Sequence, residues 1–155
     1  SLAGISKTQW LGRMQKIKTG PLIKIINKNF NKKIILGGSH NPDGIKLLVR
    51  NLKKYSGEEW QIIFGSMNTR NPAELFNYLK PITSLIVTLK IPEQENSHSS
   101  LHLKDKANQL GLNAISANSL NDAVNLVSKN SLPVCICGSL YLAGYFLKIN
   151  KNKVN

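Results

Sequence analysis

Short apolar runs alternate along most of this chain with stripes of apolar residues at helical spacing. Five runs have the length and apolar character of buried strands: residues 33–36, 60–64, 84–89, 112–116 and 132–137. Five segments between and after them favour helices: residues 42–55, 72–79, 101–110, 120–128 and 139–149. This alternation predicts an open, mostly parallel sheet with helices on both faces and right-handed crossovers.

Local signals mark where several of these helices begin and end. Asn41-Pro42 and Asn71-Pro72 each place a capping side chain before a proline that suits the first helical position. Glu74 follows Asn71 as the acid of a capping box. Gly111 comes directly after the 101–110 segment, where a helix commonly ends in a glycine.

The N-terminal part of the domain is expected to add an edge to the sheet. Residues 21–26 (PLIKII) have a β-like composition, and residues 27–31 join them to the 33–36 run as a hairpin-type loop. The expected fold class is therefore α/β and Rossmann-like. It comprises a doubly wound, mostly parallel sheet of about six strands flanked by helices, with an N-terminal antiparallel edge hairpin.

The chain of 155 residues is long enough for one domain with its own core. We expect residues 1–20 to be an irregular interdomain linker, residues 21–150 to form the domain, and residues 151–155 to be a disordered tail, with Asn150 already frayed. The first residues are Ser-Leu-Ala-Gly, with no Met, so we expect a piece of a longer protein or a processed product. No apolar run approaches the roughly 20 residues that span a membrane, and no signal segment is evident.

The two cysteines, Cys135 and Cys137, lie within one predicted strand and would point to the same face. Two thiols two residues apart in a strand are poorly placed to bridge each other, so we expect buried structural thiols and a reducing cytoplasm. A metal site would need further ligands. His98 and His102 are four residues apart, but nothing in the sequence connects them to the cysteines.

The net charge is +13, and 18 of the 21 basic residues are lysines. Such a charge suits either a solvated lysine-rich surface or an anionic partner. The lysines are scattered, only three arginines are present, and aromatic residues make up 6% of the chain with no stacking array. We therefore expect no nucleic-acid partner, whereas attraction for small polyanions such as nucleotide phosphates remains open.

Ligands of doubly wound sheets bind beyond the carboxyl ends of the strands. The loops at those ends carry residues 37–41, 65–71, 90–97 and 138–139. In the first of them, Gly37 and Gly38 permit positive φ and close approach of the backbone to a ligand. His40 could donate to a phosphate or carboxylate or transfer a proton, or could merely close a turn with Asn41.

The other loops leave comparable alternatives. Arg70 is suited to meet an anion or to remain solvated, and Ser139 to cap a helix or to offer a ligand hydroxyl. No Ser-His-acid triad can be traced from the spacing, and the chain contains neither GxxxxGK[ST] nor GxGxxG. The chain therefore cannot be a complete nucleoside triphosphatase or dinucleotide enzyme by itself.

Four motifs in order resemble the C-terminal domain of folylpolyglutamate synthase/dihydrofolate synthase, a relative of the Mur ligases. The family pattern is approximately W-P-G-R-[LMF]-[EQ], D-G-A-H-N-P, F-G-x-[ML] and C-G-S-L-Y-L. The matching segments here are WLGRMQ at 10–15, GGSHNP at 37–42, FGSM at 64–67 and CGSLYL at 137–142. The resemblance covers essentially the whole chain.

The resemblance implies ATP-dependent amide formation. The carboxylate of dihydropteroate or of a folate glutamate tail is phosphorylated, and the amine of L-glutamate attacks the acyl phosphate. ATP and Mg²⁺ are implied, with the metal bound mainly by an N-terminal domain that also carries the phosphate loop and most of the pterin site. That N-terminal ligase domain is the implied partner, and no membrane is implied.

The same resemblance implies roles for individual residues. Arg13 matches an arginine near the ATP phosphates, and His40 matches the cleft histidine, which we expect to be both catalytic and nucleotide-binding. Gly38 and Asn41 belong to the same nucleotide-binding motif. Ser139 matches the cleft serine of C-G-S and is the expected substrate-binding residue. None of these residues is an expected metal ligand.

Two positions depart from the family pattern. Gly37 stands where the family has an aspartate that is expected to hold the nucleotide ribose, and Asp43 lies beyond Pro42, where it does not replace that carboxylate. Leu11 replaces a proline in the first motif. We therefore expect this chain alone not to catalyse ligation. The alternatives are a degenerate Rossmann-like module that binds nucleotide or protein, and a basic nucleic-acid-binding domain that is supported by charge alone.

Overall fold

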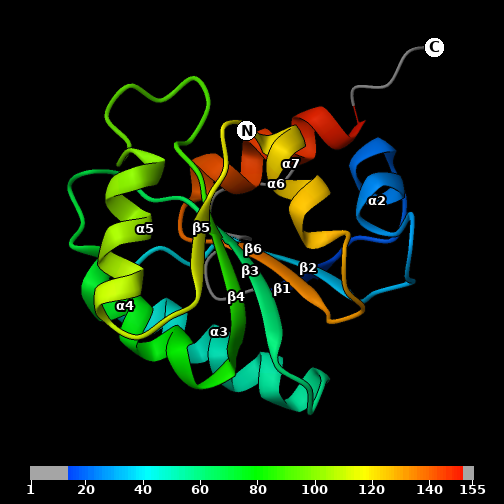
Figure 1. Cartoon of the computed structure of the whole chain (residues 1–155), viewed down its shortest axis with the longest axis horizontal. Helices are drawn as coiled ribbons and strands as arrows, with labels where there is room; N and C mark the ends of the chain where they lie inside the picture. The colour runs from blue at the N-terminus through cyan, green and yellow to red at the C-terminus, as the bar shows by residue number, and fades with distance from the viewer. Residues whose placement is uncertain (1–13, 152–155) are drawn as a thin grey trace.

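The computed structural model describes residues 14–151 and contains a six-stranded mixed sheet between two layers of helices (Figure 1). The sheet order is β1-β2-β6-β3-β4-β5. Only the β1–β2 pair is antiparallel, and all other pairs are parallel. The strands are β1 (Met14–Lys16), β2 (Ile34–Gly37), β3 (Trp60–Phe64), β4 (Thr83–Thr88), β5 (Ala114–Ser116) and β6 (Val134–Cys137).

The helices divide evenly between the two faces of the sheet. The helices are α2 (Pro21–Ile26), α3 (Pro42–Tyr55), α4 (Pro72–Leu79), α5 (Ser100–Gln109), α6 (Leu120–Val127) and α7 (Leu140–Lys151), with a short 3₁₀ turn, η1 (Lys80–Ile82). Helices α3, α4 and α5 pack on one face, whereas α2, α6 and α7 pack on the other. Both faces of the central strands are therefore buried, which explains their continuous apolar sequences.

Alternate strand residues divide between the two halves of the core. Ile35 and Cys135 face the layer of α3, α4 and α5, whereas Leu36 and Ile136 face the layer of α2, α6 and α7. Cys135 and Cys137 are free and buried on the same face, as the sequence predicted. Among residues 14–151, no helix has the length and apolarity needed to cross a membrane.

Most of the predicted elements are confirmed, and three have the predicted bounds: α3, β3 and α4. The predicted caps explain this accuracy. The side-chain oxygen of Asn41 accepts from the Gly44 amide at 2.8 Å, and that of Asn71 accepts from the Ala73 amide at 3.0 Å. Gly111 has φ +86°, as expected of a glycine that ends a helix.

The strand predicted at residues 21–26 is wrong, because this segment forms helix α2. The edge strand that pairs antiparallel with β2 is instead β1, which lies within the stretch expected to be an irregular linker. Antiparallel pairing at the N-terminal edge is thus confirmed, but with other residues. A long-range contact stabilises the helix, because the Asn150 side-chain oxygen accepts from the amides of Leu22 at 3.0 Å and Ile23 at 3.4 Å.

The prediction that Asn150 is frayed is also wrong. Asn150 lies in α7, is 6% exposed, and donates its amide to the carbonyl oxygen of Thr19 at 2.9 Å. Lys151 is the last residue of that helix. A polar side chain near the end of a chain is ordinarily solvated, but here it satisfies backbone groups of a helix more than 120 residues away.

Candidate functional site

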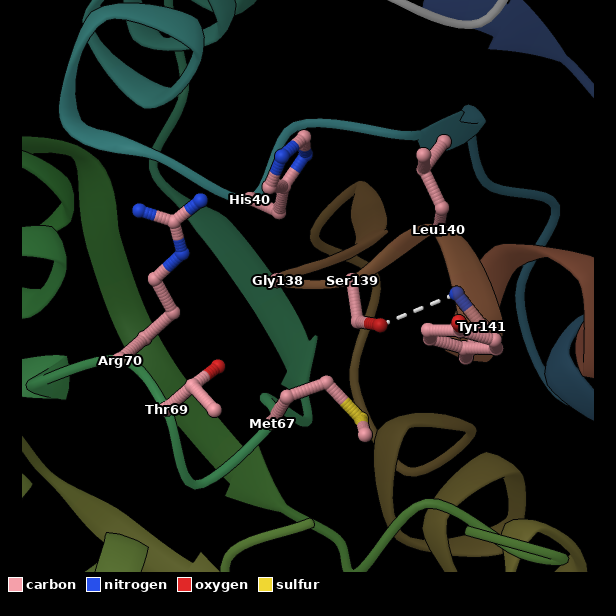
Figure 2. A pocket seen from close by; sticks show the side chains of 8 residues that line it. All are labelled: His40, Met67, Thr69, Arg70, Gly138, Ser139, Leu140 and Tyr141. Atoms are coloured by element: carbon pink, nitrogen blue, oxygen red, sulfur yellow. Dashed lines mark hydrogen bonds between the residues drawn. The ribbon is translucent and has the colours of Figure 1, made fainter. Parts of the chain in front are cut away.

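Three adjacent strands, β2, β6 and β3, end beside one cavity at the carboxyl edge of the sheet. The cavity has a volume of about 180 Å³. Its lining comes from the loops that follow these strands and from the first turn of α7: His40, Met67, Thr69, Arg70, Gly138, Ser139, Leu140 and Tyr141 (Figure 2). The position is the one at which doubly wound sheets bind ligands.

Glycines allow the three strand ends to lie this close together. Gly138 has φ +113°, and a Cβ there would collide with the carbonyl oxygen of Gly65 and the Phe64 ring. A Cβ on Gly65 would lie 2.8 Å from the carbonyl oxygen of Leu89. The residue of the site that needs a positive φ is therefore Gly138.

The positive φ that Gly37 and Gly38 permit is not used, since neither has a φ in that region. Gly37 is the last residue of β2 and extends its ladder. A Cβ at Gly37 would point toward α3 and lie 3.3 Å from the Leu48 methyl groups. Close packing against a helix, and no special backbone conformation, thus favours glycine at this position.

His40 stands on the wall formed by the β2–α3 loop. Its Nδ1 lies 3.5 Å from the carbonyl oxygen of Gly38, and the ring is partly exposed. Asn41 uses its side-chain oxygen to cap α3, and Gly38 and Asn41 are outside the set that lines the cavity. Of the residues expected in this motif, His40 is therefore the one whose side chain is offered to a ligand.

Ser139 is buried at the start of α7, where its Oγ accepts from the Tyr141 amide at 3.0 Å (Figure 2). Of the two open alternatives, the helix-capping role is thus observed. The hydroxyl hydrogen is still available for donation, because a hydroxyl both donates and accepts. The first turn of α7 borders the cavity through Leu140 and Tyr141, so the positive end of a 12-residue helix faces it.

Arg70 lies in the β3–α4 loop, and its guanidinium lies on the same side of the cavity as the His40 ring (Figure 2). His98 holds this loop from the β4–α5 connection. Its Nε2 donates to the carbonyl oxygen of Arg70 at 2.7 Å, and its amide donates to the carbonyl oxygen of Ser66 at 2.9 Å. No local pattern in the sequence indicates this pairing, because the two residues lie on different loops.

The cavity has a positive electrostatic character. Arg70 supplies a permanent positive charge and His40 a ring nitrogen, and among the described residues no Asp or Glu lines the cavity. Such a lining suits an anion and offers no carboxylate ligand for a divalent cation. Among residues 14–151, no group of three or more His, Cys, Asp or Glu side chains is arranged to hold a metal ion.

The two thiols lie beneath the site and do not contribute to it. A hydrogen bond with Cys137, burial and the neighbouring thiol together raise the pKa of Cys135 well above its usual value. A thiol of raised pKa is a poor nucleophile and a poor metal ligand near neutral pH. The Cys135–Cys137 pair is therefore structural.

The structure brings together two of the predicted site residues, His40 and Ser139, and adds Arg70 from a loop predicted to be at the rim. Arg13 lies outside the described residues. Sequence reasoning did not single out Met67, Thr69, Leu140 or Tyr141, although all four fall within or beside loops that follow predicted strands. The available signal was their position, two to four residues after the glycine that follows each strand.

The chain matches the family model of the Mur ligase glutamate ligase domain over residues 12–140. A folylpolyglutamate synthase of Lacticaseibacillus casei is 30% identical over 148 residues, which are 90% of this chain and 29% of that protein. The folylpolyglutamate synthase structure of Thermotoga maritima superposes with a TM-score of 0.74 at 25% identity, covering 94% of this chain and 32% of that one.

The fold recurs in a more distant enzyme. A Mycobacterium tuberculosis folylpolyglutamate synthase, crystallised with ADP and AMPPCP, has a TM-score of 0.72 at 14% identity and covers 90% of this chain and 34% of that one. The present chain thus spans about a third of the length of these relatives. The match over residues 12–140, together with the positive cavity at the carboxyl edge of a doubly wound sheet, shows that the chain belongs to the Mur ligase glutamate ligase domain family.

Proposed function

We propose that this chain is the ATP- and glutamate-side domain of a ligase that joins L-glutamate to dihydropteroate or a folate through an acyl phosphate. An N-terminal ligase domain is its partner in this reaction, and the cytoplasm is its setting. The observation that carries the proposal is that His40, from the GGSHNP motif, and Ser139, from the CGSLYL motif, line the same cavity. The folylpolyglutamate synthase similarity of the whole chain supports it.

Phosphate groups are the ligand that the cavity suits best. His40 and Arg70 provide positive or donor groups, and the first turn of α7 adds the positive end of a helix. The M. tuberculosis relative was crystallised with ADP and AMPPCP, and the Escherichia coli relative with DHPP and ADP. In this proposal ATP supplies the phosphoryl group that activates the substrate carboxylate.

Each side chain then has a definite task. The Nδ1 of His40 faces the Gly38 carbonyl oxygen, so its Nε2 is the atom that would hold a proton or a phosphate oxygen. The Ser139 hydroxyl, which already accepts from the Tyr141 amide, would donate its hydrogen to a substrate carboxylate. Arg13 would bind the nucleotide phosphates, and Gly38 and Asn41 would shape the loop. Mg²⁺ would be held mainly by the N-terminal domain, because no carboxylate lines this cavity.

Binding of ATP to the purified chain tests the nucleotide part of the proposal. We expect His40→Gln and Arg70→Gln each to weaken binding by about tenfold, as removal of a charge-assisted hydrogen bond does. Lys104→Gln, on α5 and outside the lining, is the matched control and should leave the affinity unchanged. Equal affinities of all four proteins would contradict the assignment.

Phosphate release tests the ligase part. The chain alone should release no phosphate with ATP, L-glutamate and dihydropteroate. A chimera in which it replaces the corresponding last third of the L. casei enzyme should release phosphate only when all three substrates are present. Release by the isolated chain would contradict the need for an N-terminal domain.

A second candidate, a degenerate module that binds nucleotide or protein without ligation, is favoured by Gly37. In the chimera, Gly37→Asp should strengthen nucleotide binding if a ribose contact has been lost. Because a Cβ at this position lies 3.3 Å from Leu48, the substitution is best combined with Leu48→Ala, and Leu48→Ala alone is the control. An unchanged affinity of the double variant relative to that control would contradict the ribose explanation.

A further inference from the structure

A second cavity lies at the opposite edge of the sheet, where the parallel strands begin. Its volume is about 330 Å³, and it is lined by residues from β1 and the turn after it, from the α2–β2 loop, and from the end of α3. The C-terminal end of β1 and the start of β2 meet here, because Lys16 pairs with Ile35 in the antiparallel ladder. The cavity is therefore separated from His40 and Ser139 by the length of the central strands.

Lysine is concentrated in the lining of this cavity. Four of the nine lining residues are lysines (Lys16, Lys18, Lys32 and Lys33), whereas lysine accounts for 18 of the 155 residues in the chain. None of the eight Asp and Glu residues of the chain lines it. The four ammonium groups make no salt bridge with any carboxylate in the described part of the chain. An anion bound in this cavity would be attracted by the lysine charges around it.

The lysines are held by neutral groups. The Nζ atoms of Lys16 and Lys33 lie 4.4 Å and 4.9 Å from the centroid of the Tyr55 ring. Lys33 also donates to the carbonyl oxygen of Tyr55 at 3.1 Å. Lys16, Lys18 and Lys33 are exposed, so their charges remain available to a ligand.

Lys32 forms a buried part of the cavity wall. This side chain is only 9% exposed, and its Nζ donates to the carbonyl oxygens of Ile26, Phe30 and Ser128. Burial lowers the pKa of Lys32, because the charged form is desolvated. Because its three ammonium hydrogens are donated to these carbonyl groups, Lys32 fixes the inner wall of the cavity, and the ammonium groups free to bind a ligand are those of Lys16, Lys18 and Lys33.

We propose that this cavity is a binding site for a compact polyphosphate anion, distinct from the candidate ligase site. Ammonium groups bind phosphate as point charges, and the volume is within the usual range of small-ligand pockets. The side chain of Asn31 contributes a further lining amide. A small ligand is favoured over a nucleic acid, because the lysines line one cavity and do not follow a groove, and Tyr55 is the single aromatic residue in the lining formed by residues 14–151.

Calorimetric titration of the purified chain with inorganic tripolyphosphate at low ionic strength tests the proposal. Lys16→Gln/Lys33→Gln should weaken binding by about tenfold or more, because two of the four charges are removed. The matched control is Lys104→Gln/Lys106→Gln on α5, which removes the same net charge elsewhere and should change the affinity less than about twofold. Equal losses in the two double variants would show non-specific attraction and overturn the site.

Three further arms locate and identify the ligand. Arg70→Gln, which weakens phosphate binding at the carboxyl edge, should leave the tripolyphosphate binding that depends on Lys16 and Lys33 unchanged, and loss of that binding in this variant would place the anion in the other cavity. Citrate, a carboxylate of similar charge, should bind at least about tenfold more weakly, and equal affinity would overturn the phosphate assignment. An oligothymidylate that binds more tightly than tripolyphosphate, and that depends on Lys16 and Lys33, would replace the proposal with a nucleic-acid site. Thermal unfolding of each variant confirms that it is folded.

Discussion

The two edges of the sheet are both positively charged, but they are constructed differently. At the carboxyl edge, the cavity depends on backbone geometry: Gly138 and Gly65 bring strand ends together, and caps begin the adjacent helices. At the amino edge, the cavity depends on long side chains from separate segments, among them Lys16 and Lys33. Backbone geometry is specified by short motifs, whereas side-chain convergence depends on how the whole chain folds.

The largest expected effect on stability comes from replacing Gly138, which the carboxyl edge requires, and Gly57 is the comparison because its surroundings do not require glycine. Gly138→Ala should lower the free energy of unfolding by about 3 kcal/mol, because a left-handed backbone and a collision with the Gly65 carbonyl oxygen combine. A Cβ on Gly57 would have no atom within 4 Å, so Gly57→Ala should change stability by less than about 0.5 kcal/mol. Urea denaturation measures both, and similar losses would contradict the argument from geometry.

The second prediction concerns the hydrogen bonds by which the Asn150 side chain fixes residues 19–23. This stretch lies between the two chain segments that carry the lysines of the amino edge. Asn150→Ala removes the acceptor of the Leu22 and Ile23 amides and the donor to Thr19, and should cost about 2 kcal/mol. Asn113→Ala, which loses one bond of 3.5 Å from an exposed side chain, should cost less than about 0.5 kcal/mol. If the two variants are equally stable, the cap supplied by α7 does not stabilise α2.

The third prediction tests the dry core between the edges, which contains the thiol of Cys135. Since the pKa of this thiol is raised in the folded state, the unfolded chain ionises first as the pH rises above about 8.5. Stability from this group is complete below that pH, and about 1 kcal/mol of it is lost between pH 8 and 9.5. Denaturation at both pH values should show a smaller loss for Cys135→Ala. An identical loss would indicate that the thiol is not responsible.

The smallest expected effect concerns the contact that positions Arg70 at the carboxyl edge. His98→Ala should cost about 0.5 to 1 kcal/mol, because it removes the 2.7 Å bond to the Arg70 carbonyl oxygen on an exposed loop. His102 stacks on His98 with ring centroids 4.9 Å apart, and His102→Ala is the matched control that retains the bond. Urea denaturation should give a lower free energy of unfolding for His98→Ala than for His102→Ala, and the reverse order would contradict the positioning role.

Prediction from the sequence succeeded where short-range chemistry was decisive. The bounds of α3 and α4 follow from Asn41 and Asn71, each followed by a proline, and the apolar run of β3 lies between glycines at positions 57 and 65. It failed at residues 21–26, where an apolar run is compatible with either a strand or a helix. Asn150 caps this segment as a helix, and no local pattern can include a residue that lies so far along the chain.

For the candidate site, the sequence indicated His40 and Ser139 but did not indicate which glycine adopts a positive φ. Gly37 ends strand β2 and neither Gly37 nor Gly38 has a positive φ, whereas Gly138 has φ +113°. A Gly-Gly pair permits positive φ, but the pair alone does not show whether either glycine adopts it. The difference is settled by packing, because the Cβ position of Gly138 is already occupied by the Gly65 carbonyl oxygen.

The sequence by itself determined the alternation of strands and helices, the mostly parallel sheet and the edge at which a ligand would bind, because caps, periodicity and apolar runs are local properties. Only the tertiary structure decided that Met14–Lys16 is the edge strand, that His98 holds Arg70, and that four lysines surround one cavity. These outcomes depend on contacts between residues far apart in the chain. Their stability comes from burial and hydrogen bonding that exist only after the layers have packed.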